Sequence, residues 1–446
     1  MSMEFNQKLY DDLVEAVFMR SPSVQQVGFD GKSYKPGLAQ MEAFDAALGH
    51  PSQAFRSIHV AGTNGKGSVC HLLASVLSAA GFRVGLYTSP HLTDFRERMK
   101  IVSEGMVPKE YAYDFLTQWQ PYFYRNNLSF FEITTGLAFR WFADQGIDIA
   151  VVETGLGGLL DSTNILPAPL LTIVTNIGLD HMALLGQTLP EIAAQKAGIF
   201  KSGVPALVGE SDPQTDPVFA ETAWMRCPSI SFADKLRPSL WYRKAEILKK
   251  MDLQADCQEK NLRTVLAALD ILRDSAGIRT DEARTLDALI HTAERTQLHG
   301  RWEKLSDCPW VICDIGHNAH ALRYNFDKLQ RLVEEGKADS LLIVYGIMAD
   351  KDLDSILPLM PPESTYFFAA PDTPRALPAE ELLSRYQAWC TAQGRSSVRA
   401  YSAPSVREAV RMATTMAQSL SSDSRPLVYI GGSTFVVSEA FTLFRR

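Results

Sequence analysis

The chain has little of what secreted, membrane-spanning or disulfide-stabilised proteins need. Its 446 residues include six cysteines, and no two of them are spaced as a C-x-x-C pair. In a chain of this length such cysteines are typical of reduced thiols in a cytosolic enzyme. The sequence has no apolar run of about 18 residues, the length that a membrane-spanning helix requires. Its first residues, Met-Ser-Met-Glu-Phe-Asn-Gln, have neither the basic nor the apolar segment of a signal peptide. We therefore expect a cytoplasmic protein with no membrane partner.

The chain also has fewer positively charged residues than negatively charged ones. The 44 lysines and arginines are outnumbered by 51 aspartates and glutamates, which gives a net charge of −7. Nucleic-acid-binding proteins carry the opposite balance, so we expect no nucleic-acid partner. A hydrophobic content of 46% and a charged content of 21% are typical of a globular protein. The length exceeds that of one ordinary hydrophobic core and favours two domains.

Short strand-like runs alternate with amphipathic helical segments, such as Pro108–Gln118 and Glu132–Gln145, along the chain. This alternation predicts an α/β fold with mostly parallel sheets and helices on both faces. The strand-like runs are rich in β-branched residues; they are Val84–Tyr87, Ile147–Glu153, Leu170–Asn176, Val204–Val208, Trp310–Asp314, Leu341–Tyr345, Thr365–Ala369 and Leu427–Ile430.

A helical segment from Lys260 to His291 separates the two series of strands. We place the domain boundary near Gln297, so the expected domains are residues 1–296 and 297–446. No internal repeat stands out in either half.

A glycine-rich turn follows one more strand-like run, Ser57–Val60, and precedes a helical pattern that opens at Ser68. Strand, glycine turn and helix together form the device that binds nucleotide phosphates. The glycines let backbone N–H groups turn toward phosphate oxygens, and the helix N-terminus adds partial positive charge. Lys66 would reach the outer phosphates and Ser68 would contact Mg²⁺.

This turn departs from the standard G-x-x-x-x-G-K-[ST] loop. The first glycine of that pattern would fall at Val60, and Gly67 separates Lys66 from Ser68. An ordinary strand-to-helix turn is therefore the alternative interpretation. The coincidence of three glycines, a lysine and a serine between strand and helix favours a phosphate loop.

Polar residues follow the other predicted strands at the edge where the phosphate loop lies. Ser89, Glu153 and His181 each come just after a strand end and offer ligands for Mg²⁺. The alternatives are a turn residue for Ser89 and a loop-capping histidine for His181. Glu153 ends an apolar run, where a carboxylate without a cation would be costly.

Three further polar groups have ordinary structural explanations. Lys196 lies near the end of a short predicted helix, where a solvated lysine is favoured by the helix dipole. Arg301 follows a glycine, and Asp314 precedes a turn. With His317 they begin the second half, which indicates a face directed at the nucleotide.

Several motifs in this order resemble the folylpolyglutamate synthase and dihydrofolate synthase family, which is related to the Mur ligases. The similarity runs from about Lys35 to Val437. The motifs that carry it are Gly62-Thr-Asn-Gly-Lys-Gly-Ser68, Tyr87-Thr-Ser-Pro-His-Leu92, Phe95-Arg-Glu-Arg98, Glu153-Thr-Gly-Leu-Gly-Gly158, Asp161-Ser-Thr-Asn164, Asp180-His181, Lys196-Ala-Gly-Ile199 and Asp314-Ile-Gly-His-Asn318.

The resemblance implies roles for residues that physical reasoning alone left open. It implies catalytic roles for Lys66, Lys196 and His181, and a carbamylated side chain at Lys196. It implies Mg²⁺ ligands at Ser89, Glu153 and His181. The implied ATP contacts are Thr63, Asn64, Gly65, Lys66, Gly67, Ser68, Asn261, Arg301, Asp314 and His317, and the implied pterin pocket contains Phe131, Glu132, Leu160 and Asp161.

The family also implies an architecture and an activity. We expect an N-terminal phosphate-loop domain with a parallel sheet and a smaller, Rossmann-like C-terminal domain of a Mur-ligase-like fold. The expected enzyme is an ATP-dependent, Mg²⁺-dependent amide ligase that adds L-glutamate to dihydropteroate and to folates through an acyl phosphate. The arginines of Phe95-Arg-Glu-Arg98 are suited to holding substrate carboxylates. We expect a monomer.

The chain departs from the family pattern at positions that bear on pterin and glutamate specificity more than on ATP use, and two alternative functions also stay open. Ile315 and His299 replace residues of the usual Asp-Gly-Ala-His-Asn and Pro-Gly-Arg motifs, and Leu159 follows the double glycine where some members have a polar residue. One alternative is a Mur-type ligase that acts on a UDP-sugar peptide, although the segment before the phosphate loop is short for a UDP-binding domain. The other is a nucleotide-binding switch without ligase activity.

Overall fold

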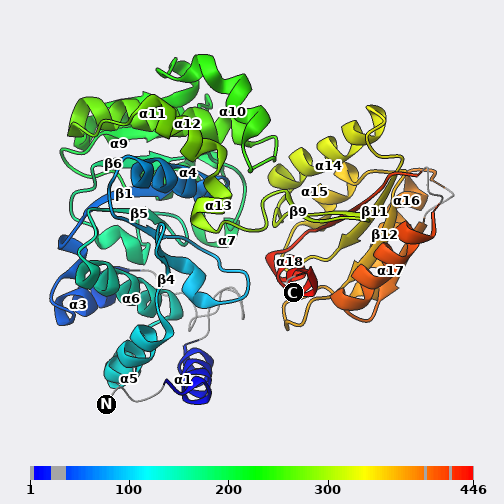
Figure 1. Ribbon diagram of the computed structural model, residues 1–446, viewed down its shortest axis with the longest axis horizontal. Helices are drawn as coiled ribbons and strands as arrows, with labels where there is room; N and C mark the ends of the chain where they lie inside the picture. Colours follow the sequence, from blue (N-terminus) through cyan, green and yellow to red (C-terminus); the bar gives the residue numbers. More distant parts are fainter. Residues whose placement is uncertain (1–4, 22–36, 396–398, 421–423, 445–446) are drawn as a thin grey trace. The chain divides into compact units, whose positions relative to one another are not determined.

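The computed structural model describes residues 5–21, 37–395, 399–420 and 424–444. Lys35, where the family resemblance begins, and the first four residues of the N-terminal stretch lie outside this part of the chain. Figure 1 shows the course of the chain from the N-terminus to the C-terminus.

The chain divides into two units, each with its own sheet and core. Unit 1 comprises Met1–Asp252 and Gln258–Gln297, and unit 2 comprises Leu253–Cys257 and Leu298–Arg446. The main division thus lies between Gln297 and Leu298, next to the expected boundary. The short excursion Leu253–Cys257 into unit 2 has no signal in the sequence, because nothing in its composition distinguishes it from a loop.

The sheet of unit 1 has eight strands among the described residues, in the order β4-β3-β2-β5-β1-β6-β7-β8. Its central strands are buried and pair in parallel, as the continuous apolar runs of their sequences predict. β3 and β4 add an antiparallel edge that the sequence analysis did not predict. The strands are β1 (Arg56–Ala61), β2 (Val84–Tyr87), β3 (Met99–Ile101), β4 (Gly105–Met106), β5 (Ile149–Glu153), β6 (Leu171–Val174), β7 (Ala206–Val208) and β8 (Ile230–Phe232).

Helices cover both faces of this sheet (Figure 1), with α4, α11 and α12 on one face and α3, α5 and α6 on the other. The α-helices are α1 (Gln7–Arg20), α3 (Ala39–Ala47), α4 (Lys66–Ala79), α5 (Lys109–Asn126), α6 (Phe130–Gln145), α7 (Met182–Leu185), α8 (Leu189–Ala197), α9 (Asp216–Arg226), α10 (Lys244–Lys250), α11 (Gln258–Ala276), α12 (Glu282–Ile290) and α13 (Thr292–Thr296). Short 3₁₀ turns are η1 (Pro51–Gln53), η2 (Phe95–Arg98), η3 (Ser162–Ile165), η4 (Ala233–Lys235) and η5 (Trp241–Arg243).

Unit 2 has a six-stranded sheet within the described residues, in the order β13-β12-β11-β14-β10-β9. All neighbours pair in parallel except β9, which is antiparallel to β10. The strands are β9 (Glu303–Asp307), β10 (Trp310–Cys313), β11 (Ser340–Tyr345), β12 (Thr365–Ala369), β13 (Arg399–Ala403) and β14 (Pro426–Gly431). The helices are α14 (Ala319–Glu334), α15 (Leu353–Ile356), α16 (Ala379–Ala392), α17 (Val406–Ser419) and α18 (Thr434–Phe444), with the 3₁₀ turn η6 (Leu357–Leu359). The predicted α/β class with mostly parallel sheets is confirmed.

Two of the differences from the expected helix bounds have a clear physical cause. The helix expected from Pro108 to Gln118 continues as α5 to Asn126, through Pro121. Proline normally breaks a helix, but beyond it Phe123 is fully buried, so packing of the last turn outweighs the lost hydrogen bond. α4 begins at Lys66 rather than Ser68, because Gly65 adopts the left-handed conformation that serves as its N-cap.

One face of α4 is polar although the helix is almost wholly buried. Ser68, His71 and Ser75 are spaced to lie on the same face, and each binds a different helix. Ser68 accepts from Gln258 of α11, His71 Nδ1 lies 2.7 Å from Thr296 Oγ1 of α13, and Ser75 donates to the Ala288 carbonyl of α12. These bonds fix the phosphate-loop helix against the helices that precede unit 2.

The polar face of α4 yields a stability prediction. Ser75→Ala removes a buried hydroxyl that donates to the Ala288 carbonyl at 2.8 Å, so the free energy of unfolding should fall by about 1 kcal/mol, although Thr292 Oγ1 still donates to that carbonyl. Ser78→Ala, one turn further along, removes a hydroxyl that is partly exposed and should leave stability unchanged or slightly raised, because alanine is the better helix former. Urea unfolding of the two variants measures the difference, and equal stabilities would contradict the role given to Ser75.

Candidate active site

The glycine loop connects β1 to α4 and is held in a single conformation by close contacts. Gly62 has φ 144°, and a Cβ atom there would lie 1.8 Å from Thr175 Oγ1. Gly65 has φ 81°, and a Cβ atom there would lie 2.4 Å from Asn261 Oδ1. Only glycine fits either position, since both combine a left-handed backbone with a neighbour at contact distance.

The end of β6 supports this loop from the side. Asn64 N donates to Asn176 Oδ1 at 2.9 Å, and Thr63 N donates to the Asn176 carbonyl at 2.9 Å. Thr175 Oγ1 donates back to the Asn64 carbonyl at 2.6 Å. The loop is therefore shaped before any ligand arrives, as a phosphate site requires.

Glu153 brings two of the predicted functional groups together at the end of β5. Its Oε1 lies 3.9 Å from the ammonium of Lys66, and its Oε2 accepts from Ser89 N at 3.1 Å. The carboxylate is only 4% exposed, while the Lys66 side chain is 17% exposed and opens to solvent. The sequence analysis placed all three residues at one sheet edge, and the structure does the same.

Lys66 and Lys196 donate to the same acceptor. Lys66 Nζ lies 3.1 Å from the Gly62 carbonyl oxygen, and Lys196 Nζ lies 2.9 Å from it. Burial, together with the nearby charge of Lys66, lowers the pKa of Lys196 to about 7. The expectation of a solvated lysine is wrong for Lys196, because α8 turns this side chain into the protein rather than toward solvent.

His181 follows β6 in the loop that leads to α7. It adopts φ 52°, and its Nε2 lies 3.9 Å from Asp180 Oδ1. The negative charges of Asp180 and Asp161 raise the pKa of Lys196, opposing burial. The His181 loop therefore lies close enough to Lys196 to influence its proton.

The loop after β5 docks on the end of α8, the helix that carries Lys196. Leu159 N donates to the Gln195 carbonyl at 2.8 Å, and Asn164 Nδ2 donates to the carbonyls of Leu159 and Gly198. A Cβ atom at Gly198 would lie 2.4 Å from Leu159 Cα, so glycine permits the close approach.

The four residues expected in a pterin pocket have different surroundings. The Phe131 ring lies over Gly155, where a Cβ atom would meet it at 2.5 Å, and the Leu160 side chain is 39% exposed. Asp161 is buried and accepts from Leu156 N, Thr163 N and Thr163 Oγ1. Glu132 Oε2 accepts from the backbone and hydroxyl of Ser129 and caps α6. A helix-capping role explains this buried carboxylate without a substrate.

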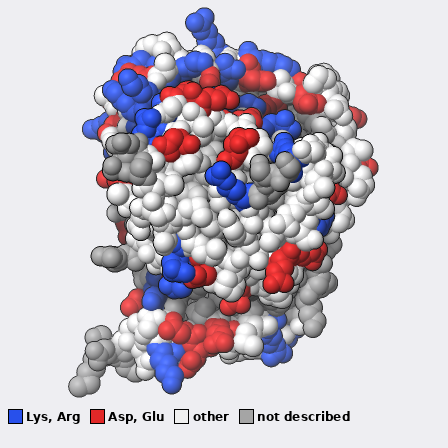
Figure 2. All heavy atoms as spheres, turned by 90° about the vertical axis from the view of Figure 1, so that its right-hand side faces the viewer, with Lys and Arg blue, Asp and Glu red and all other residues white. Residues whose placement is uncertain are grey.

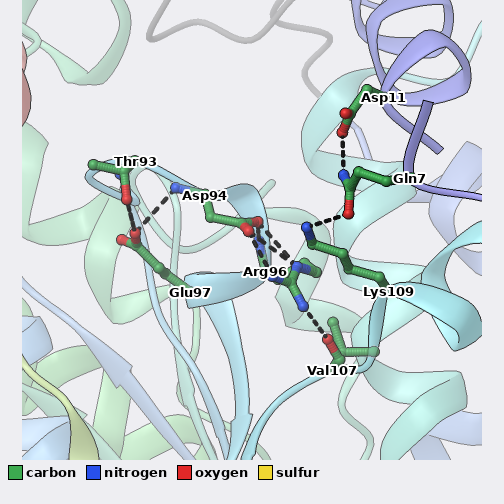
Figure 3. A network of polar contacts seen from close by, with 8 residues as sticks. All are labelled: Gln7, Asp11, Thr93, Asp94, Arg96, Glu97, Val107 and Lys109. Carbon is green, nitrogen blue, oxygen red and sulfur yellow. Dashed lines mark hydrogen bonds and ion pairs between the residues drawn. The ribbon is translucent and has the colours of Figure 1, made fainter. Parts of the chain in front are cut away.

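The arginines of the Phe95-Arg-Glu-Arg98 motif are engaged within their own loop. In Figure 3, Glu97 binds the segment that precedes it, while Arg96 binds Asp94 and the Val107 carbonyl. Arg98 is buried, donates to His91 Nδ1 at 2.9 Å and stacks over Phe130. Burial and the Arg98 charge keep the pKa of His91 well below its usual range. Both guanidinium groups thus shape the loop that carries Ser89.

Gln258 and Asn261 lie at the start of α11, against the phosphate loop. Gln258 Nε2 donates to Ser68 Oγ at 3.3 Å, and Asn261 Nδ2 donates to Gln258 Oε1 at 2.9 Å. Asn261 Oδ1 faces Gly65, because a Cβ atom at Gly65 would lie only 2.4 Å from it. The predicted nucleotide residue Asn261 therefore borders the loop.

In unit 2, Asp314 organises the turn that follows β10. Its Oδ2 accepts from Trp302 N, and its Oδ1 accepts from Gly316 N and Asn325 Nδ2. Trp302 adopts φ 52°, which the bond to Asp314 helps to hold. Arg301 precedes it and donates to the Gly300 carbonyl, and His317 Nδ1 lies 3.2 Å from the Ile315 carbonyl. Asp314 brings these two loops together.

The donor set at the sheet edge fits Mg²⁺. Among the described residues, no three His, Cys, Asp or Glu side chains are arranged to enclose a metal ion. Mg²⁺ commonly binds through one or two carboxylates, waters and substrate phosphates rather than a protein cage. The buried carboxylate of Glu153 beside Ser89 and the phosphate loop provides hard oxygen atoms of that kind.

Sequence reasoning missed the residues that support the site from behind. Thr175 shapes the glycine loop, Thr163 and His59 lie beneath Asp161, and Asn325 fixes Asp314. Thr175 had a usable signal, because it is polar and ends a strand predicted beside the phosphate loop. Thr163 lies within the Asp161-Ser-Thr-Asn164 motif, which assigns a role to Asp161 and none to Thr163. His59 and Asn325 are single polar residues in apolar surroundings, which no motif distinguishes from ordinary core residues.

Comparison with known proteins decides the family. The Mur ligase middle domain matches residues 60–262, and the glutamate ligase domain of Mur ligases matches residues 300–425. The dihydrofolate synthase/folylpolyglutamate synthase of Escherichia coli (strain K12) is 33% identical over 358 residues, 79% of this chain and 82% of that protein. The chain belongs to the dihydrofolate synthase/folylpolyglutamate synthase family.

Solved structures of this family have the same fold. The Escherichia coli FolC structure with DHPP and ADP has a TM-score of 0.76 at 26% identity and covers 97% of each chain. A bifunctional folylpolyglutamate synthase/dihydrofolate synthase from Yersinia pestis, complexed with AMPPNP and a Mn ion, has a TM-score of 0.75 at 26% identity and covers 97% of each chain. The expected Mur-ligase-like fold is confirmed, and the chain is an ATP-dependent ligase. None of the helices described is long and apolar enough to cross a membrane.

The pKa of Lys196 gives a measurable signature. Its value of about 7 lies below that of an unfolded lysine, so the folded state loses stability as pH falls from about 10 to 7 and loses no more below 7. In CO₂-free buffer, the stability of the wild type relative to Lys196→Met should therefore fall by about 1.4 kcal/mol per pH unit across that window.

The control is Lys235→Met, which replaces a lysine whose side chain is 56% exposed. Urea unfolding at several pH values measures both differences. A difference for Lys196→Met that stays constant from pH 7 to 10 would show that this lysine titrates like an exposed one.

Proposed function

We propose that this ligase is bifunctional and adds L-glutamate both to dihydropteroate and to folylpolyglutamates. The observation that carries the proposal is the ordered edge of unit 1, where the phosphate loop, Glu153 and Lys196 lie beside the loop that contains Asp161. Relatives named for both activities, and one structure with DHPP and ADP, support the same interpretation.

The reaction requires activation of a carboxylate, because a carboxylate oxygen is a poor leaving group. Bound ATP supplies a phosphoryl group that makes the acceptor an acyl phosphate, and Mg²⁺ neutralises phosphate charge. Lys66 extends its ammonium from the phosphate loop and stabilises negative charge on the transferring group. Ser89, Glu153 and His181 hold the metal, and Thr63, Asn64, Gly65, Gly67 and Ser68 contact phosphates.

Lys196 is suited to carbamylation. Its pKa of about 7 leaves a large fraction of the amine neutral at physiological pH, and only a neutral amine adds CO₂. Addition of CO₂ to the neutral amine forms an N–C bond, releases one proton and replaces a buried neutral group with an anion. A carbamate beside Lys66 would remove the repulsion between two ammonium groups that share the Gly62 carbonyl.

The acceptor site is assigned to the loop after β5 and the start of α6. Phe131 and Leu160 offer apolar surface for a pterin ring, and Asp161 offers a carboxylate that accepts its N–H groups. Glu132 is assigned to this set by the family resemblance alone. Its carboxylate already binds Ser129 as a helix cap, so a contact between Glu132 and the pterin has the least support.

The remaining assignments concern the nucleotide and the state of the enzyme. Asn261, Arg301, Asp314 and His317 contact the nucleotide in this proposal. Asp314 also shapes the turns around it through the three hydrogen bonds that its oxygens accept. The enzyme is proposed to act as a cytoplasmic monomer.

Lys and Arg lie among Asp and Glu on the face drawn in Figure 2, whose centre is covered by uncharged residues.

The test offers each acceptor separately. ADP release should depend on L-glutamate together with either dihydropteroate or tetrahydrofolate, because both carry a carboxylate on a pterin-containing body. Activity with one acceptor alone would contradict bifunctionality, and activity only with a UDP-sugar peptide would assign the enzyme to the Mur ligases. ADP release that depends on neither acceptor would indicate a nucleotide switch.

Lys66→Ala separates this chemistry from contaminating activity in the same assay. The variant should lose roughly 3 kcal/mol of transition-state stabilisation, on the order of a hundredfold in rate, and remain folded. Lys235→Ala, an exposed lysine, is the matched control and should retain full activity.

A further inference from the structure

His59 is a buried polar residue in the middle of the central strand β1. It is fully buried and lies in register with Val152 of β5 and Thr172 of β6. Its Nε2 lies 2.8 Å from Thr163 Oγ1, in the turn η3. Its Nδ1 has no hydrogen-bond partner within the described part of the chain. Burying a polar ring nitrogen that makes no hydrogen bond costs free energy, so this histidine is expensive to keep in the core.

The hydrogen atoms along this contact can be assigned. Thr163 has one hydroxyl proton, and it donates that proton to Asp161 Oδ1 at 2.5 Å. Thr163 Oγ1 must therefore accept from His59, so the imidazole carries its proton on Nε2. Burial and the charge of Lys201 lower the pKa of His59 to about 3, in agreement with a neutral ring whose Nδ1 is bare. The result is a one-way chain from His59 through Thr163 to Asp161.

Asp161 connects the hydrogen bonds of His59 and Thr163 to the loop after β5, where the acceptor is proposed to bind. Its Oδ2 accepts from Leu156 N at 2.8 Å, and its Oδ1 accepts from both the N–H and the hydroxyl of Thr163. Burial raises the pKa of Asp161, and these neutral donors act in the opposite direction. Removing one donor would therefore both loosen the carboxylate and favour its protonation.

We propose that His59 and Thr163 are positioning residues that hold the Asp161 carboxylate ionised and in place for the N–H groups of the pterin acceptor. The inference rests on the proposed function, in which Asp161 belongs to the acceptor site. His59 reaches the substrate only through Thr163 and Asp161 and never touches it.

A purely structural role is the competing explanation, and Thr172 provides a matched control for it. Thr172 is as buried as Thr163, lies in register beside His59 and donates to the Pro205 carbonyl at 3.2 Å. Thr163→Val and Thr172→Val remove the same hydroxyl from the same core without changing side-chain shape. Both should lower the free energy of unfolding, Thr163→Val by more, because its hydroxyl makes two buried hydrogen bonds and that of Thr172 makes one; urea unfolding measures both losses.

The readout that separates positioning from stability is the KM for each substrate. Thr163→Val should raise the KM for dihydropteroate about tenfold, the effect of one lost hydrogen bond to a charged group, and leave the KM for ATP unchanged. Thr172→Val should change neither. Thr163→Ser keeps the hydroxyl and should restore the wild-type KM for the acceptor.

The His59 variants complete the test. His59→Leu should raise the KM for dihydropteroate as Thr163→Val does, and the double variant should be no worse than either single one, because both break the same chain. His59→Gln keeps an N–H donor near the Nε2 position and should recover part of the loss.

Asp161→Asn distinguishes failure of this inference from failure of the proposed function. If Asp161→Asn raises the KM for dihydropteroate and Thr163→Val does not, the positioning chain is overturned while the acceptor site stands. If Asp161→Asn leaves that KM unchanged, Asp161 is not an acceptor residue and both proposals for it fail. Equal KM changes in Thr163→Val and Thr172→Val would also overturn the inference.

Discussion

The candidate site depends on one carbonyl oxygen that accepts hydrogen bonds from two lysines. Lys66 and Lys196 both donate to Gly62, so their ammonium groups are held close together in a partly buried setting. Like charges at such a distance repel, and the more deeply buried group gives up its proton more easily. The φ of 144° at Gly62 and its contact with Thr175 fix this carbonyl. A buried amine with a lowered pKa beside the Lys66 ammonium follows from that geometry.

Buried carboxylates shape a loop in each unit by the same physical means. Asp161 in unit 1 and Asp314 in unit 2 each accept three hydrogen bonds, from backbone N–H groups and from one side chain. Neutral donors of this kind stabilise a buried charge without the geometric demands of an ion pair. Each carboxylate thereby joins segments that are separate in the sequence, such as Leu156 with Thr163 and Trp302 with Asn325.

The sequence predicted the elements and residues that local patterns determine. Apolar runs located the central strands, and the glycine turn located Lys66 beside Glu153 and Ser89. Lys196 shows the limit of local reasoning: its position near a helix end favoured solvent, and only docking of the loop at Leu159 on α8 explains its burial. The β3–β4 edge and His59 were missed because short strands and single buried polar residues leave no periodic signal.

The central claim is that the acceptor carboxylate is activated by phosphoryl transfer before glutamate attacks it. An acceptor whose carboxylate carries oxygen-18 tests this most directly, with mass spectrometry of the phosphate released. The oxygen that bridges carbon and phosphorus in an acyl phosphate leaves with phosphorus when the amine displaces it. The account predicts that each inorganic phosphate contains a labelled oxygen and that the new amide retains the other. Unlabelled phosphate, or label found in AMP, would contradict it.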